Sequence, residues 1–186
     1  MGSLLTSIGL AIPAGLNAYI PLLAVAICQR AGWLELREPY SLLGEWWAIA
    51  LISVLLIVEL VADKVPAVDH VNDVIQTVVR PTAGGLLAVA VSPASSGVHP
   101  AVLVIAGIVI AGSVHAAKAT TRPAVNTTTA GTGAPVVSAI EDVFATIATV
   151  VAIALPYLVG IALVAVAVLF WWLWSRKRRA ASGAPA

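Results

Sequence analysis

The segment from Glu59 to Pro81, ELVADKVPAVDHVNDVIQTVVRP, concentrates side chains whose types and spacing suit chemistry. Carboxylates at helical spacing are ligands for Mg²⁺, Ca²⁺ or Mn²⁺, and a histidine among them suits Zn²⁺. Asp69, His70 and Asp73 are therefore the candidate metal ligands, but no HExxH motif or cysteine pair supports them and we predict no bound cofactor. The ionisable residues of the segment are Glu59, Asp63, Lys64, Asp69, His70, Asp73 and Arg80.

Acid–base catalysis is a second chemistry that these residues suit, with His70 or His115 beside a carboxylate. The chain has no GxSxG nucleophile motif, and no Gly-Lys-Ser/Thr follows the glycines near residue 131, so a phosphate-binding loop is not indicated. We therefore predict that the protein is not an enzyme. A membrane-embedded hydrolase or transferase acting on lipid is the least supported alternative.

The chain around this segment has the composition of an integral membrane protein. Its 186 residues are 60% hydrophobic and only 10% charged, whereas about a quarter of the residues of a soluble domain are charged. The net charge of +1 argues against a nucleic-acid partner. Ionisable groups at membrane depth are costly and mark functional sites by default. Two other interpretations remain open: an interfacial helix with its charges in water, or a structural ion-pair network.

The hydrophobic pattern predicts an all-α, polytopic fold with about five membrane spans plus broken, re-entrant or interfacial helices. Residues 4–28 form the first predicted span, which Pro13, Gly15 and Asn17 interrupt. A second span covers 46–62, and a helix with a polar side begins at Pro66.

Three further elements are expected after Arg80 and Pro81. The apolar stretch that follows Pro81 is too short for a regular crossing and suggests a broken half-helix. Residues 101–117 form the third span, and 136–174 form two more with a turn near Pro156. Residues 1–174 thus constitute one membrane domain. The basic tail 175–186 (SRKRR and the residues after it) is expected to be cytoplasmic by the positive-inside rule, with a disordered end.

A short internal similarity links two parts of the chain. Pro-Ala-Val-Asp at 66–69 recurs as Pro-Ala-Val-Asn at 123–126, in each case after a hydrophobic span that ends in charged residues. Transporter folds often contain such repeats, with polar sites where broken helices meet, so an internal repeat and a chance match both stay open. The candidate polar pathway comprises Asn17, Glu59, Asp63, Lys64, Asp69, His70, Asp73, Arg80, His115, Lys118, Arg122, Asn126, Glu141 and Asp142.

The motifs GLNAYIPLL, ELVADKVPAVDHVNDVIQTVVRPTAG, HAAKATTRPAVN and SAIEDV together resemble the DUF4126 family of small bacterial integral membrane proteins. The likeness covers residues 9–150. The chain departs from the family where TTTAGTGAP replaces a Ser-Pro-Glu-Pro-like run, so no role is carried over for that glutamate. The resemblance implies a single membrane domain and supplies no reaction.

These features predict a small multi-pass transporter or channel for a small polar or ionic solute in the inner or plasma membrane. Its expected partners are the lipid bilayer and either further copies of the chain or a larger membrane complex. The alternative is a non-catalytic accessory subunit that stabilises such a complex. If the internal repeat is real, its two Pro-Ala-Val motifs should approach each other near mid-membrane. Lys118 or Arg122 should then reach the acidic residues between positions 59 and 73.

Overall fold

The computed structural model describes residues 3–63, 66–129 and 133–181, and the side chains at 66–71, 122–128, 134 and 177–181 lie outside that description. Every regular element within these ranges is helical, which confirms the all-α part of the predicted fold class. The elements are α1 (Leu4–Leu16), α2 (Tyr19–Arg30), the 3-10 helix η1 (Tyr40–Gly44), α3 (Trp46–Ala62), α4 (Pro66–Ala90), the 3-10 helix η2 (Ala94–Ser96), α5 (Pro100–Thr128), α6 (Ala134–Ala154) and α7 (Pro156–Ala181).

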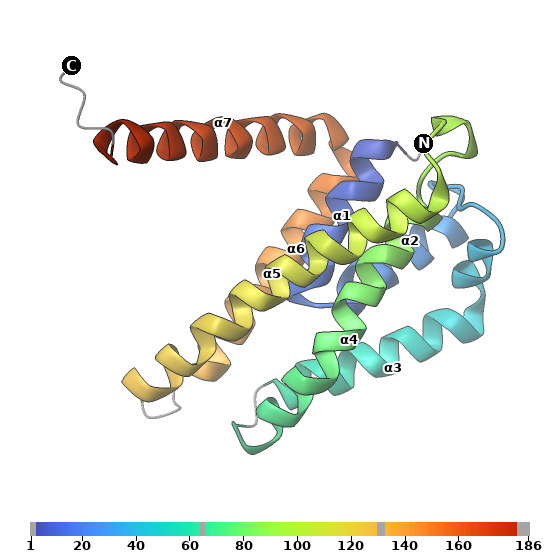
Figure 1. Ribbon diagram of the computed structural model, residues 1–186. Coiled ribbons are helices and arrows are strands. Elements are labelled where there is room, and N and C mark those ends of the chain that lie inside the picture. Colours follow the sequence, from blue (N-terminus) through green and yellow to red (C-terminus); the bar gives the residue numbers. More distant parts are fainter. Residues whose placement is uncertain (1–2, 64–65, 130–132, 182–186) are drawn as a thin grey trace.

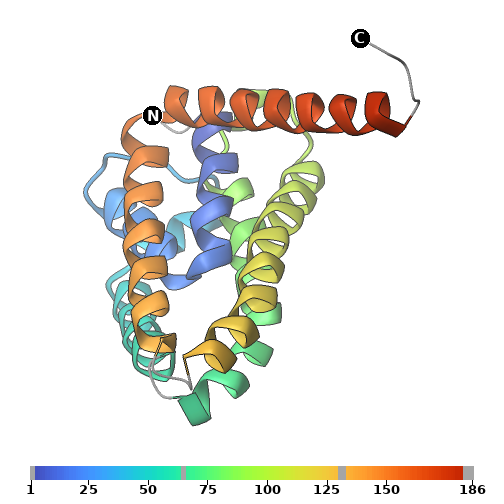
Figure 2. The ribbon, with the colours of Figure 1, turned by 90° about the vertical axis from the view of Figure 1, so that its left-hand side faces the viewer.

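Helix α1 is the centre of the bundle. It packs against α4, α5 and α6, and Figure 2 shows it between α6 and the crossing pair α4 and α5. Small residues, among them Gly9, Ala11, Ala14 and Gly15, make up much of its buried surface. Small side chains let helix backbones approach closely, and this is how helices pack where lipid provides no hydrophobic driving force between them.

The most extensive helix pair is α4 with α5. The two backbones meet at Gly84 and Gly107, where a Cβ atom on either glycine would collide with the backbone carbonyl of the other. Ala88 and Ala111 border the same contact. The crossing therefore depends on the absence of side chains at these two positions.

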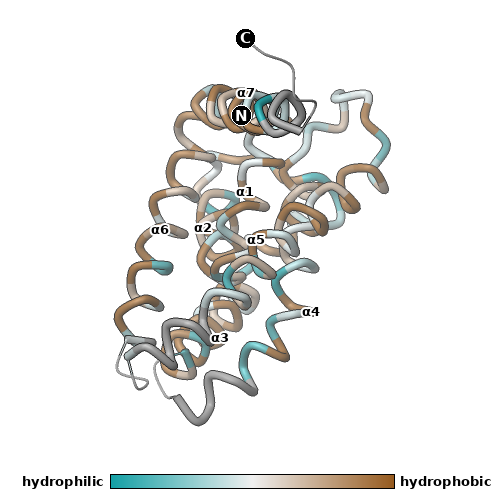
Figure 3. The backbone as a smooth tube through the Cα atoms, turned by 60° about the vertical axis from the view of Figure 1, so that its left-hand side comes forward, coloured by the Kyte–Doolittle hydropathy of each residue, from teal (hydrophilic) through white to brown (hydrophobic). Residues whose placement is uncertain are grey.

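From Val74 to Arg80, the buried side chains of α4 are polar and most of the exposed ones are apolar. Gln76 and Arg80 are fully buried, whereas Val74, Ile75 and Val78 are more than half exposed. Figure 3 shows hydrophilic segments along α4, in contrast to the mainly hydrophobic α6. In its described part, α4 is therefore not the water-exposed interfacial helix that was one interpretation of the sequence.

The expected first span, 4–28, is two helices rather than one. The chain leaves helical geometry at Asn17, whose backbone is extended, while Pro13 is accommodated inside α1. With 13 residues in α1 and 12 in α2, neither half has the roughly 20 residues that a bilayer crossing needs.

The helix break predicted after Arg80 is wrong, because α4 continues through Pro81 to Ala90. A proline inside a helix costs about 3 kcal/mol, and here the packing of Gly84 and Gly85 against α5 holds the helix together. The third predicted span, 101–117, is also shorter than the helix that the structure shows. Helix α5 continues past residue 117 and through Pro123 to Thr128.

Three helices in the described ranges are long and apolar enough to cross a membrane, fewer than the five predicted: Pro100–Thr121, Pro135–Ala154 and Pro156–Arg176. The predicted turn near Pro156 is confirmed, since α6 ends at Ala154 and α7 begins at Pro156. Helix α7 turns away from α6 and projects beyond the body (Figures 1 and 2).

We expect Gly107→Ala to destabilise the protein by about 1–3 kcal/mol, the usual cost of overpacking. Its new methyl group would meet the backbone of Gly84, which cannot move without separating α4 from α5. Gly112→Ala is the matched control on α5, because its Cβ would lie 3.6 Å from Pro81, an ordinary contact. Thermal unfolding in detergent measures both variants, and equal melting temperatures would contradict the close crossing.

Candidate functional site

A cluster of buried charges lies where α3, α4 and α5 meet, and Arg80 is its centre. The Arg80 side chain is fully buried, and its Nη2 donates to Glu59 Oε1 at 2.9 Å and lies 3.7 Å from Asp63 Oδ2. Glu59 lies in the last turn of α3 and Asp63 is the C-cap residue that follows this helix, and both are only 1–2% exposed. One guanidinium therefore faces two carboxylates, away from solvent.

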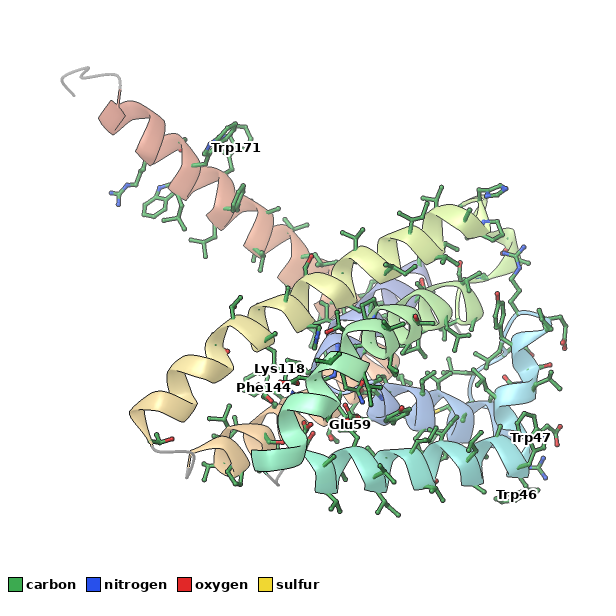
Figure 4. The ribbon with its side chains drawn as sticks, turned by 60° about the horizontal axis from the view of Figure 1, so that its bottom comes forward. Trp46, Trp47, Glu59, Lys118, Phe144 and Trp171 are labelled. Atoms are coloured by element: carbon green, nitrogen blue, oxygen red, sulfur yellow. The ribbon has the colours of Figure 1, made fainter. Side chains whose placement is uncertain are left out.

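Lys118 of α5 is the second cation of the cluster and joins it to α1 and α6. Its Nζ lies 2.8 Å from Glu141 Oε2 and 3.4 Å from Asp63 Oδ2. It also donates to the backbone carbonyl of Leu16 at 3.1 Å. Leu16 is the last residue of α1, where the carbonyls lack helical partners and the helix dipole favours a positive charge. An ammonium group has three donors, so these contacts saturate it. Figure 4 shows Glu59 and Lys118 inside the helical body, well away from Trp46 and Trp47 at the other end of α3.

Asp63 is the most completely bonded carboxylate of the cluster. Its Oδ1 accepts from Asn72 Nδ2 at 2.6 Å. Its Oδ2 accepts from Lys118 and from the Ser138 hydroxyl, each at 3.4 Å. Asp63 therefore bonds to side chains of α4, α5 and α6.

Glu59 is bonded very differently from Asp63. Its Oε1 takes the bond from Arg80, but its buried Oε2 has no hydrogen-bond partner. Arg80 Nε and Gln76 Oε1 are also buried without a partner. Unsatisfied buried polar atoms are uncommon and costly, so the cluster is incomplete on the side of Glu59.

His115 completes the cluster and is held as a neutral ring. Arg80 Nη1 lies 3.1 Å from His115 Nδ1, and since a guanidinium only donates, Nδ1 must accept. The proton of the neutral ring is then on Nε2, which lies 3.1 Å from the Thr77 hydroxyl. That hydroxyl donates in turn to the backbone carbonyl of Asp73. Thr77 is exposed, so this chain of contacts leads from the buried cluster to the surface of α4.

The break between α1 and α2 is held by Asn17, which is fully buried. Its side-chain oxygen accepts from the backbone N–H groups of Tyr19 and Ile20, which caps the start of α2. Its Nδ2 donates to Asp142 Oδ1 at 3.0 Å. Asn17, one of the predicted pathway residues, thus ties the broken helix to α6.

The structure brings together much of the predicted polar pathway. Contact between Lys118 and the acidic residues is confirmed by its pairing with Asp63. Asp73 is half-buried at the edge of the cluster. Five predicted residues, Lys64, Asp69, His70, Arg122 and Asn126, have side chains outside the described part of the chain.

Sequence reasoning missed the Leu16 carbonyl, Asn72, Thr77 and Ser138 as members of the cluster. Helical spacing was the available signal: Asn72 and Thr77 lie on α4 near Gln76 and Arg80, and Ser138 precedes Glu141 by one turn. No sequence signal marks a backbone carbonyl such as that of Leu16.

The candidate metal site finds no support in the described residues, which contain no group of three or more metal-ligating side chains placed to hold an ion. Arg80 and Lys118 occupy the positions beside Glu59 and Asp63 that a cation would take. The predicted ligands Asp69 and His70 lie outside the described side chains.

The two copies of the predicted repeat lie at different places in their helices. Pro66–Asp69 opens α4, whereas Pro123–Asn126 lies inside α5 near its end. The backbone therefore does not show two equivalent segments. The buried ion pairs join α3, α4 and α5 instead.

A family model described as "Domain of unknown function (DUF4126)" matches residues 4–176, nearly the whole chain. No curated protein and no solved structure matches.

We expect Lys118→Ala to lower the free energy of unfolding by about 3–5 kcal/mol, because it removes a buried cation that pairs with buried Asp63 and half-buried Glu141. Arg30→Ala is the control: Arg30 is exposed and stacks on Trp46, so its loss should cost no more than about 1 kcal/mol. Melting temperatures in detergent test both variants. The double variant Lys118→Ala/Glu141→Gln should recover part of the loss, and a Lys118→Ala protein that melts like wild type would contradict the buried network.

Proposed function

The chain belongs to the DUF4126 family, and we propose that it is a small multi-pass membrane transporter or channel for a small polar or ionic solute. The observation that carries this proposal is the buried cluster of Arg80, Lys118, Glu59 and Asp63 beside the break between α1 and α2. Transporters place their polar sites where interrupted helices meet inside the membrane.

The distribution of side chains supports membrane embedding. In addition to the three apolar helices of spanning length, the outer face of α4 is apolar while its buried face carries charge. A soluble helix has the opposite arrangement. We propose that the shorter apolar helices α1, α2 and α3 complete the intramembrane body. Exposed Trp46 and Trp47 begin α3, and Glu59 lies about 20 Å along the helix axis from them, well inside a hydrocarbon layer about 30 Å thick.

We propose that the protein lies in the inner or plasma membrane with its C-terminus cytoplasmic. Exposed Trp171, Trp172 and Trp174 precede the SRKRR segment, and aromatic residues followed by a basic cluster are typical of the cytoplasmic end of a span. A chain of this size encloses little volume alone, so we propose that it acts as a homo-oligomer.

A purely structural network would satisfy each of its buried groups. Here Glu59 Oε2, Arg80 Nε and Gln76 Oε1 are left without partners. Such atoms raise the energy of the state in which they occur, and an arriving solute or ion that binds them lowers it. This difference favours a transport site over a structural one.

Flux into liposomes tests the proposal. Purified protein should give solute- or proton-dependent flux, and Glu59→Gln should reduce that flux at least tenfold, because it removes the charge that faces Arg80. Glu35→Gln is the control: this exposed residue lies outside the cluster, and its variant should retain wild-type flux. Absence of flux from the wild-type protein across a broad panel of ions and metabolites would contradict the proposal.

A second candidate, an accessory subunit of a larger membrane complex, is favoured by α7. Only 6% of the apolar stretch of α7 is buried within the protein, and the helix projects from the body with Trp171 exposed (Figure 4).

Detergent extraction of native membranes followed by affinity purification distinguishes the two functions. An accessory subunit should retain a stoichiometric larger partner, and shortening the chain after Leu155 should release that partner. Self-association alone would count against this second function.

A further inference from the structure

Deepening the proposed transport function, on which this inference rests, we propose that the transported solute is an uncharged molecule of the size of water, either water itself or ammonia. Its binding site consists of three buried side-chain atoms, Glu59 Oε2, Gln76 Oε1 and Arg80 Nε. None of the three has a hydrogen-bond partner among the described residues.

Two of these atoms belong to an ion pair that is only half formed. Nε and Nη2 lie on one edge of the planar guanidinium, and arginine–carboxylate pairs frequently use two parallel hydrogen bonds. Here Arg80 Nη2 donates to Glu59 Oε1 at 2.9 Å, whereas Arg80 Nε and Glu59 Oε2 form no hydrogen bond. A buried donor and a buried acceptor therefore stand side by side, each without a partner.

Gln76 brings a second acceptor to the same place. It lies one helical turn before Arg80 on α4, so the two side chains are neighbours on one face of the helix, and both are fully buried. Tyr19 of α2 interacts with the side-chain amide of Gln76 and with the charges of Glu59 and Arg80. The three residues are thus gathered around one tyrosine, at the start of the helix that follows the break at Asn17.

The three atoms define the hydrogen bonds that a ligand must form. Glu59 Oε2 and Gln76 Oε1 are acceptors, so the ligand must supply two donors. Arg80 Nε is a donor, so the ligand must also supply a lone pair. Water and ammonia each meet this requirement with a single heavy atom, whereas an alcohol with one hydroxyl group would leave an acceptor unpaired.

Ions fit the same three atoms poorly. A metal cation or an ammonium ion has no lone pair to accept from Arg80 Nε, and the guanidinium charge repels it. An anion would have to lie against the oxygen of Gln76 and the carboxylate of Glu59. A site that offers a donor on one side and two acceptors on the other therefore favours an uncharged ligand over an ion of either sign.

Burial limits the size of the ligand. Glu59, Gln76 and Arg80 are each at most 2% exposed, so a molecule that binds their free atoms is enclosed by protein. Urea and glycerol also offer donors and lone pairs, but on atoms spread over a larger molecule. Their entry would require α3 and α4 to separate, and the ion pair between Glu59 and Arg80 opposes this.

A cavity of about 350 Å³ lies beside the cluster, between α2, α3 and α6. Its walls include Ile20 and Leu60, the residues that follow Tyr19 and Glu59 in the sequence. The polar residues of its lining are Asp142 and Thr146, and the others are apolar. A mainly apolar approach penalises an ion, which would lose its hydration there, far more than an uncharged molecule.

A high-resolution crystal structure of the full-length protein tests the site directly. Wild-type protein should show one peak of ordered density within about 3.2 Å of Glu59 Oε2, Gln76 Oε1 and Arg80 Nε. Gln76→Met removes the acceptor oxygen at nearly constant side-chain length and should lose the peak. Thr82→Val is the matched control, because Thr82 is exposed on α4, and it should keep the peak. A wild-type structure without the peak would overturn the inference, whether or not Gln76→Met folds.

Stopped-flow measurements on liposomes identify the solute. Osmotic shrinkage in sucrose reports water, and alkalinisation of an enclosed pH dye after addition of ammonium chloride reports ammonia. Wild-type protein should accelerate one or both processes above the rate of protein-free liposomes. Gln76→Met should slow the protein-dependent part about fivefold, the effect of losing one hydrogen bond, and Thr82→Val should leave it unchanged.

The two measurements separate this inference from the transport function. Flux of urea, glycerol or an ion without flux of water or ammonia would overturn the proposed solute and leave transport in place. The same holds for flux that Gln76→Met does not alter. An ordered peak without any flux would refute transport and leave the three atoms as a binding site.

Discussion

The fold depends on the requirement that a charge removed from water must find partners inside the protein. Lys118 meets this requirement with three acceptors, the Leu16 carbonyl, Asp63 and Glu141, which come from α1, α3 and α6. Arg80 does the same for α3 and α5 through Glu59 and His115. Each partner must be held within hydrogen-bond distance, so the two cations fix the relative positions of helices far apart in the sequence.

The same requirement explains why α1 stops where it does. A continuous helix through Asn17 would bond the Leu16 carbonyl within the helix and leave Lys118 one acceptor short. The break frees that carbonyl for Lys118, and Asn17 then caps α2 and binds Asp142. The backbone polar groups released at the break therefore have hydrogen-bond partners inside the protein, as a break within a membrane requires.

Close packing and charge pairing act together along α4. Gly84 meets Gly107 of α5 at backbone contact, and one turn before Gly84 the buried guanidinium of Arg80 reaches His115 on the same partner helix. The apolar residues Val74 and Val78 are left outside. A helix with charge inside and valine outside suits a lipid environment, which is the setting of the proposed function.

The sequence by itself determined the helical class, the start of α4 at Pro66 and the break before Pro156, because hydrophobic runs and prolines act locally. It also determined which ionisable residues had to be accounted for, since charge in an apolar chain is visible without a structure. Only the tertiary structure decided that α4 passes through Pro81, because packing across Gly84 outweighs the local preference of proline. The pairing of Lys118 with Asp63, and the difference between a saturated Asp63 and a half-bonded Glu59, were likewise beyond the sequence. They depend on distances between helices, and helical spacing constrains only neighbours on one helix.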